Sequence, residues 1–218
     1  MRIFLFLCIL SAGFSTFSGC SSRNKEGLKS RHFFDEIEGP DDYAEVFDDQ
    51  TKEDRSHSEF QPVIAAQTTF WNSKLRESYV RERSNRFHLP AEEAKQLAVE
   101  ELTENETYIV FLMSVATREY EWNKLDRKSS LWRISLEGDQ AKEPIAPDRI
   151  QVISDKDEVA KYFYKYMTTF TRTYRVRFLR ESLKGSEHLR LFVSGVRGSL
   201  HFEFQNDNPR PKAHLESQ

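Results

Sequence analysis

Ile109-Val110-Phe111-Leu112-Met113-Ser114-Val115 alternates with the two-residue period of a β-strand. The odd-numbered positions from 109 to 115 place apolar side chains on one face. Val110 and Leu112 make the opposite face apolar as well. Antiparallel strands commonly keep one face in water, so a strand that is apolar on both faces is expected to be covered on both.

Several stretches on the C-terminal side of this strand repeat the same alternation. They cover residues 132–136, 149–152, 166–178, 189–193 and 200–204. Gly195-Val196-Arg197-Gly198 supplies a turn between the last two stretches, which predicts a hairpin. A short helix or a loop is expected at 156–164. Because no helical pattern separates consecutive strands, the five or six strands are expected to form an antiparallel sheet.

Two helices are expected on the N-terminal side of the first strand. The apolar face of the first helix carries Phe70, Trp71, Leu75, Tyr79 and Phe87. Pro90, followed by Glu92 and Glu93, predicts the start of a second helix that ends near residues 103–105. The sequence therefore predicts an α+β, β-dominated fold. It is a single antiparallel β-sandwich-like domain over 61–205 with one or two N-terminal helices, and residues 206–218 follow as a loose tail.

Residues 20–60, which precede this domain, are predicted to be an acidic, disordered tether. From Phe33 to Glu59 the chain holds eleven acidic residues against Lys52 and Arg55. Apolar residues are sparse there, so the segment cannot bury enough apolar surface to offset the entropy of ordering. The acidic block is favoured as a solvated spacer. The alternative is a docking site for a basic partner, with a short binding motif formed by Phe33-Phe34, Tyr43 and Phe47.

The first 19 residues have the order of a secretory signal peptide. Arg2 provides a positive charge, residues 3–10 form an unbroken apolar run, and mostly small residues follow up to Gly19. The apolar run is too short to span a bilayer, which takes about 20 consecutive apolar residues. The chain is therefore expected to be exported.

Phe17-Ser18-Gly19-Cys20 resembles a lipobox, the processing site of bacterial lipoprotein precursors. The resemblance implies cleavage after Gly19, a diacylglyceryl thioether on Cys20 and acylation of the new amino terminus, with palmitate as the expected acyl group. Two or three acyl chains on one cysteine hold a protein firmly at a membrane. Ser21 in place of Asp favours the outer over the inner membrane by the same resemblance. Four basic residues near the lipid favour anionic headgroups: Arg23, Lys25, Lys29 and Arg31.

Composition argues against several classes of function. Without the signal peptide, Cys20 is the single cysteine, so the mature chain has no internal disulfide, no thiolate zinc site and no other cysteine nucleophile. From Gln61 onward, 25 basic residues stand against 23 acidic ones, so no large field predicts nucleic-acid binding. The sequence predicts no cofactor and no metal. His201 and Glu203 share a face of a predicted strand, where they could ligate a metal, form an acid/base pair or simply be part of a solvated face.

The predicted strand at 166–178 carries the clearest candidates for binding. They are Arg172, Tyr174, Arg175 and Arg177, which could contact a glycan, a lipid headgroup or an anionic polymer through charge and stacking. The alternative is an exposed face whose charges deter edge pairing.

The sequence thus predicts a membrane-anchored envelope lipoprotein that acts as a non-catalytic binding module for an envelope protein or a glycan. One alternative is an exported, lipid-anchored hydrolase using His201 or His188 with nearby carboxylates, with its catalytic residues otherwise unassigned. A weaker alternative is a soluble exported protein with no anchor.

Overall fold

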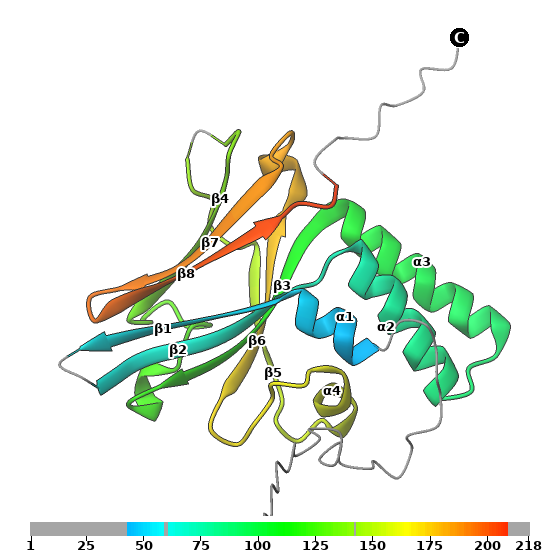
Figure 1. Ribbon diagram of the computed structural model, residues 1–218, viewed down its shortest axis with the longest axis horizontal. Coiled ribbons are helices and arrows are strands. Elements are labelled where there is room, and N and C mark those ends of the chain that lie inside the picture. Colours follow the sequence, from blue (N-terminus) through cyan, green and yellow to red (C-terminus); the bar gives the residue numbers. More distant parts are fainter. Residues whose placement is uncertain (1–42, 59–60, 142, 209–218) are drawn as a thin grey trace, which may run out of the picture. The chain divides into compact units, whose positions relative to one another are not determined.

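Two antiparallel β-sheets form the framework of the computed structural model, which describes residues 43–58, 61–141 and 143–208 (Figure 1). The large sheet has five strands, in the order β1 (Thr51–Ser58), β2 (Gln61–Phe70), β3 (Tyr108–Thr117), β6 (Arg172–Leu179) and β5 (Arg149–Ile153). The small sheet has three, in the order β4 (Trp132–Gly138), β7 (His188–Gly195) and β8 (Gly198–Gln205). The β-dominated α+β class and the β-sandwich-like arrangement are therefore as predicted.

Strand β3 is buried on both faces, as its sequence predicts. On one face, the ring centroid of Phe111 lies 5.3 Å from that of Phe70 in the same sheet and 5.2 Å from that of Phe204 in the small sheet. On the other face, Val110 and Leu112 belong to a second apolar core. Strand β3 is therefore the middle of three layers: the small sheet, the large sheet and the helices.

Helices cover the second face of the large sheet (Figure 1). The second core joins α1 (Tyr43–Asp49), α2 (Ser73–Arg86) and α4 (Glu158–Phe163) to strand β3. Aromatic rings fill much of it: the centroid of Tyr79 lies 4.8 Å from that of Phe163 and 5.2 Å from that of Trp71. The helix α3 (Ala91–Thr107) packs on α2, and two short 3₁₀ helices, η2 (Tyr120–Trp122) and η3 (Arg180–Leu183), lie in the connections.

The first predicted helix starts later than its apolar face suggests. The side chain of Asn72 accepts a hydrogen bond from the Leu75 amide at 2.9 Å, which caps α2 at Ser73. Phe70 instead ends strand β2. The second helix begins after Pro90 as predicted and ends at Thr107, two residues beyond the predicted end. The strand predicted over 166–178 begins only at residue 172, after a turn.

The prediction of a disordered tether is wrong for residues 43–58, which form α1 and β1. Tyr43, Val46 and Phe47 recur at helical spacing and are buried, so even a short acidic helix gains a packed apolar stripe. Strand β1 is mostly exposed, but its backbone pairs with β2, which leaves its charged side chains in water. Residues 20–42, 59 and 60 lie outside the described residues.

The prediction that a loose tail begins at residue 206 is also wrong for its first three residues. Asn206 is buried, and its side-chain amide donates to the Ser186 carbonyl at 2.7 Å. The guanidinium of Arg180 donates to the Asn206 side chain at 3.2 Å and to the Asn208 carbonyl at 3.3 Å. These bonds extend the domain to residue 208, and residues 209–218 lie outside the described part.

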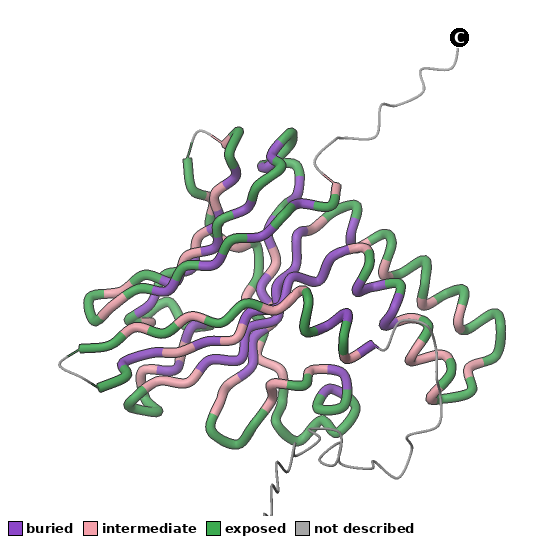
Figure 2. The backbone as a smooth tube through the Cα atoms, in the orientation of Figure 1, coloured by how far each residue is buried: buried purple, intermediate pink, exposed green. Residues whose placement is uncertain are grey.

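The two sheets meet where β1 runs beside β8. The Asp54 carboxylate accepts the backbone N–H of His201 at 2.8 Å. Gly198 has φ of +155°, and a Cβ at this position would lie 2.4 Å from the Ser56 hydroxyl oxygen. Glycine therefore permits both the hairpin turn and the close approach of the sheets. Burial is dense along β2 and β3 and sparse on α3 (Figure 2).

We predict that Phe47→Ala lowers the free energy of unfolding by about 3–5 kcal/mol, because it opens a cavity among buried rings. Phe47 is 2% exposed. Glu45→Ala on the exposed face of the same helix serves as the control and is expected to change it by less than about 0.5 kcal/mol. Urea denaturation of the two variants measures the difference. Equal stabilities would mean that α1 does not pack on the domain.

Candidate binding site between α2 and α3

Helix α3 is packed unusually loosely for a helix of 17 residues. Asn105 is its single buried residue. Val99 and Leu102 are 49% and 56% exposed, although both are apolar. The helix therefore lies beside α2 with part of its apolar surface open to solvent, as the exposed tube of α3 in Figure 2 shows.

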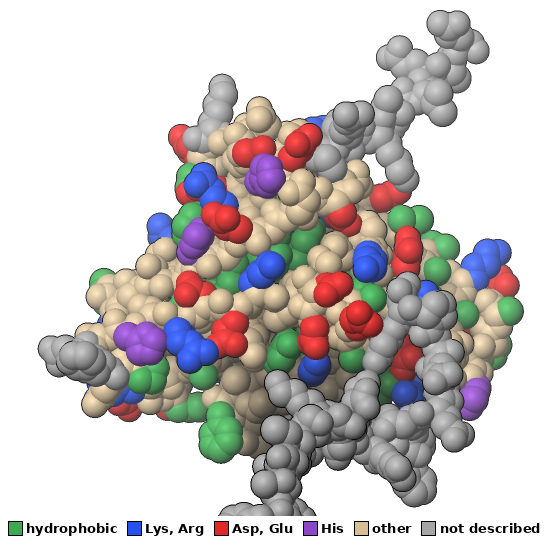
Figure 3. Space-filling model, in the orientation of Figure 1, with side chains coloured by type: hydrophobic (Ala, Val, Ile, Leu, Met, Phe, Trp, Pro, Cys, Tyr) green, Lys and Arg blue, Asp and Glu red, His purple; other side chains and the backbone are tan. Residues whose placement is uncertain are grey.

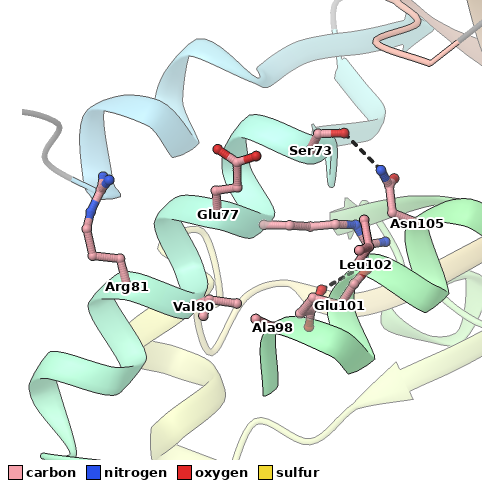
Figure 4. Close-up of a pocket in the computed structure, with 9 residues that line it drawn as sticks. Ser73, Glu77, Val80, Arg81, Ala98, Glu101, Leu102 and Asn105 are labelled. Carbon is pink, nitrogen blue, oxygen red and sulfur yellow. Dashed lines mark hydrogen bonds and ion pairs between the residues drawn. The ribbon is translucent and has the colours of Figure 1, made fainter. Parts of the chain in front are cut away.

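A pocket of about 270 Å³ opens between the two helices (Figure 4). Val80 of α2 faces Ala98 of α3 across it, and Ser73 and Asn105 close one end with a hydrogen bond of 2.9 Å from the Asn105 amide. Val80, Ala98 and Leu102 form an apolar wall, and the other six lining residues are polar or charged. Nine residues line it: Ser73, Arg76, Glu77, Val80, Arg81, Ala98, Glu101, Leu102 and Asn105.

Arg76 is the one cation among the pocket-lining residues that is fully withdrawn from solvent, with a side chain only 4% exposed. Its Nε–H donates to the Trp71 carbonyl at 3.0 Å. Its Nη1 donates to the carboxylates of Glu101 at 2.5 Å and Glu104 at 2.8 Å. Its Nη2 is buried and has no hydrogen-bond partner among the residues that the structure describes. An unmatched buried donor costs about 1–3 kcal/mol.

The carboxylates beside Arg76 are shared with a second arginine and with an indole. Glu104 also accepts a hydrogen bond from Arg175 of β6, and Glu101 accepts one from the Trp71 indole N–H at 3.0 Å. Burial acts to raise the pKa of Glu104, but the charges of Arg175 and Arg76 outweigh it and hold that pKa below its ordinary value. Two arginines thus balance two glutamates.

Removal of this charge balance is expected to loosen α3. We predict that Glu104→Gln costs about 3 kcal/mol of stability at pH 7, because it leaves Arg76 and Arg175 short of a buried counter-charge. The pKa of Glu104 is lowered in the folded state. The ionised carboxylate therefore makes its full contribution to the free energy of unfolding above the ordinary carboxyl pKa of about 4.3. That contribution is lost as pH falls through the lowered pKa.

The stability difference between wild type and Glu104→Gln should therefore shrink between pH 5 and pH 3 in denaturant titrations. Glu100→Gln, which changes an exposed carboxylate of the same helix, is the matched control and should show no such difference. A difference that stays constant over this pH range would contradict a role for the ionised carboxylate.

The four strand residues predicted to bind a ligand do not form one surface. Tyr174 is fully buried in the core between the sheets. Its hydroxyl lies 2.9 Å from the Asn123 carbonyl and accepts the Leu125 amide at 3.3 Å, and burial raises its pKa to about 12. Arg172, on the same face, donates to the Asn123 carbonyl at 3.1 Å.

Arg175 and Arg177 point to the opposite face of β6. Arg175 belongs to the charge cluster below the pocket. Arg177 pairs with Asp148 at 3.0 Å and lies over the ring of Tyr108, 4.3 Å from its centroid. All four residues thus have partners within the domain. Their role in binding a glycan or a headgroup stays a prediction, and their arrangement does not favour it.

The histidines considered for catalysis lie on the open face of the small sheet. The Nε2 atom of His201 is 3.2 Å from a carboxylate oxygen of Glu203, and its ring stacks on Phe192 at 5.5 Å. His188 and Glu203 line a separate hollow of about 360 Å³. Within the described residues, no group of three or more His, Cys, Asp or Glu side chains could hold a metal ion. A catalytic role for these histidines remains untested.

Sequence reasoning missed the pocket. The three- and four-residue spacing of Ala98, Glu101 and Leu102 was a sign of a helix face, but nothing in the sequence shows that the face stays open. Arg76 carries no sequence signal, because a basic residue on a polar helix is ordinarily solvated.

Charged side chains of both signs are interspersed over the face of the domain in Figure 3.

Comparison with protein-family models, with curated protein sequences and with solved structures finds no match for this chain. None of the helices in the described part combines the length and the apolar character that a bilayer crossing requires. Cys20, the predicted lipidation site, lies outside the described residues.

Proposed function

We propose that this chain is a lipid-anchored, non-catalytic binding module of the bacterial cell envelope, held at the outer membrane by lipid on Cys20. The signal-like order of residues 1–19 and the lipobox-like Phe17-Ser18-Gly19-Cys20 support the anchor. Residues 21–42 separate that cysteine from the first helix, so the domain has a tether. The domain's own contribution to function is then the recognition of a partner.

The α2–α3 pocket is the proposed recognition site, and the exposure of its apolar lining residue Leu102, at 56%, is the observation that supports it most directly. An occupant gains from contact with Val80, Ala98 and Leu102. It needs no net charge there, because Glu101 and Glu104 already neutralise Arg76 and Arg175. A large apolar side chain meets both requirements.

A protein segment suits this pocket better than a glycan does. The nine lining residues include no aromatic ring on which a sugar could stack. An apolar cleft between two helices is instead a common recess for side chains of a partner protein. We therefore propose an envelope protein as the partner. The hydrolase alternative has less support, because the His201–Glu203 pair lies on an exposed strand face and, among the described residues, no third polar side chain is hydrogen-bonded to the imidazole ring.

The anchor is tested by replacing its thiol. We predict that Cys20→Ala abolishes incorporation of labelled palmitate and moves the protein from the membrane fraction to the soluble fraction. The reason is that the acyl chains would supply nearly all of the membrane affinity. Phe17→Leu should leave labelling and fractionation unchanged. Membrane association that survives Cys20→Ala would refute a lipid anchor at this residue.

The pocket is tested by a charge placed in its apolar wall. We predict that Leu102→Asp lowers recovery of a cross-linked envelope partner at least about tenfold, because the aspartate would be desolvated on binding. Val159→Asp on α4 is the matched control, since Val159 is also an exposed apolar helix residue, 42% exposed against 56% for Leu102. Both variants should melt within a few degrees of wild type. Equal recovery from the two variants would exclude the pocket as the site.

A further inference from the structure

Among the described residues, the three most exposed large apolar side chains lie at one end of the two sheets. Val196, Phe170 and Tyr120 are 91%, 89% and 72% exposed, and the next such side chain is 56% exposed. Val196 lies at the tip of the β7–β8 hairpin, Phe170 in the turn before β6, and Tyr120 at the start of η2 in the β3–β4 connection. Three separate connections thus each expose one large apolar side chain.

Strand register and local contacts place these three connections together. The turn before β6 and the β3–β4 connection leave the large sheet at the same end, because the first residue of β6 pairs with Val115 near the end of β3. The β7–β8 hairpin joins them through Trp122, since the Arg197 guanidinium lies 4.2 Å from the centroid of its ring. The Trp122 carbonyl in turn accepts the indole N–H of Trp132 at the start of β4, at 3.0 Å. In Figure 1 the hairpin and the end of β3 lie on the left of the domain. Three ranges are here called the loop end: 118–131, 168–171 and 195–198.

The loop end is basic even after its internal ion pairs are set aside. Lys124 pairs with Glu121, and Arg172, which follows the turn, lies 3.7 Å from Asp126. Within the part of the chain that the structure describes, six exposed charged side chains at or directly beside the loop end form no ion pair, five basic and one acidic: Arg118, Arg127, Lys128, Arg133, Arg197 and Glu119. Basic side chains near a membrane favour anionic headgroups.

The β5–β6 connection begins at the same end and does not cancel this charge. Asp155 is next to Lys156 in the sequence, and the Asp157 carboxylate accepts the Ala160 amide at 2.9 Å as the cap of α4. The chain then turns into α4, whose Phe163 is buried in the second core with the other helices. The balance of the loop end therefore stays positive.

Single apolar side chains at the tips of basic loops suit a lipid surface better than a folded partner. Such side chains enter the interface between headgroups and acyl chains, while the cations stay among the headgroups. A protein partner ordinarily meets a more continuous apolar patch or a recess. Neither the α2–α3 pocket nor the hollow beside His188 includes a residue of the loop end.

We propose that the loop end rests on an anionic membrane surface, with Val196, Phe170 and Tyr120 among the headgroups and the five unpaired basic residues facing the lipid phosphates. The acyl chains hold the protein at the membrane, and this weaker contact orients the domain on it. The inference rests on the proposed anchor and adds a second contact that uses neither Cys20 nor the pocket. Helices α2 and α3 connect β2 to β3 at the opposite end of these strands, so the pocket stays accessible to a partner.

A fluorescent label at a single site tests this contact. A chain that begins at residue 20 and carries Cys20→Ala has no other cysteine. An N-terminal hexahistidine tag in place of the acyl chains tethers it to vesicles that contain a nickel-chelating lipid. In this background, Val196→Cys carries the environment-sensitive label nitrobenzoxadiazole. Val99→Cys on α3, with the same label, is the matched control, because Val99 is also an exposed valine.

On phosphatidylcholine vesicles with about 30 mol% phosphatidylglycerol, the label at residue 196 should brighten at least about twofold, because it enters a less polar environment. The label at residue 99 should not change. Lys128→Glu should weaken the contact at least about fivefold, and Lys74→Glu, which changes an exposed lysine of α2, should not weaken it. Raising the salt concentration should also weaken the contact, since exposed charges are screened.

Equal responses of the two labels, or no response at residue 196, would overturn the membrane contact. An equal response on vesicles of phosphatidylcholine alone would overturn it as well, because the surface would then not need to be anionic. A response to soluble heparin as large as the response to vesicles would identify a soluble polyanion in place of the membrane. The tag replaces the acyl chains and the label lies outside the pocket. A failure here therefore leaves Cys20→Ala and Leu102→Asp to decide the proposed function separately.

Discussion

The rest of the domain depends on the burial of strand β3 on both faces. Phe111 on one side packs against the small sheet, and Val110 and Leu112 on the other side pack against the helices. A strand with this pattern is stable only if something covers each face, because exposing either row would leave a line of large apolar side chains in water. The three-layer architecture follows from that requirement. The helices are thus part of the framework, and α2 in particular is fixed by Leu75 and Tyr79 in the second core.

Helix α3 contributes the partly buried Leu97 to the edge of this apolar framework and is held mainly by charge and hydrogen bonds. Glu101 and Glu104 bind Arg76 of α2, Glu104 also binds Arg175 of β6, and Asn105 accepts a bond from Arg180. Such ion pairs and hydrogen bonds fix the position of a helix without filling the space beside it. This explains how one helix can be well placed and still leave an open recess against its neighbour. A pocket of this kind is a consequence of attaching a helix by its polar residues rather than by an apolar stripe.

Sequence patterns predicted what depends on apolar periodicity and missed what depends on tertiary context. The burial of β3, the β7–β8 hairpin and the start of α3 after Pro90 all carry local signals, and each is found in the structure. Strand β2 mixes alanine, glutamine and threonine without a clear period, and β1 is a charged edge strand that is ordered by pairing with its neighbour. Composition alone therefore assigned β1 to a tether. Arg76 was missed for a related reason, since only the arrangement of α3 makes it buried.

The position of α1 determines how the domain would respond to mechanical force. Any pull on the chain ahead of Tyr43 loads a seven-residue helix first. That helix leads within two residues into β1, whose hydrogen bonds to β2 begin at Thr51. Tension applied at this end must first draw the buried Tyr43, Val46 and Phe47 out of the second core. Strand β1 would then have to part from both β2 and β8. The first resistance of the domain to load therefore comes from the apolar packing of α1.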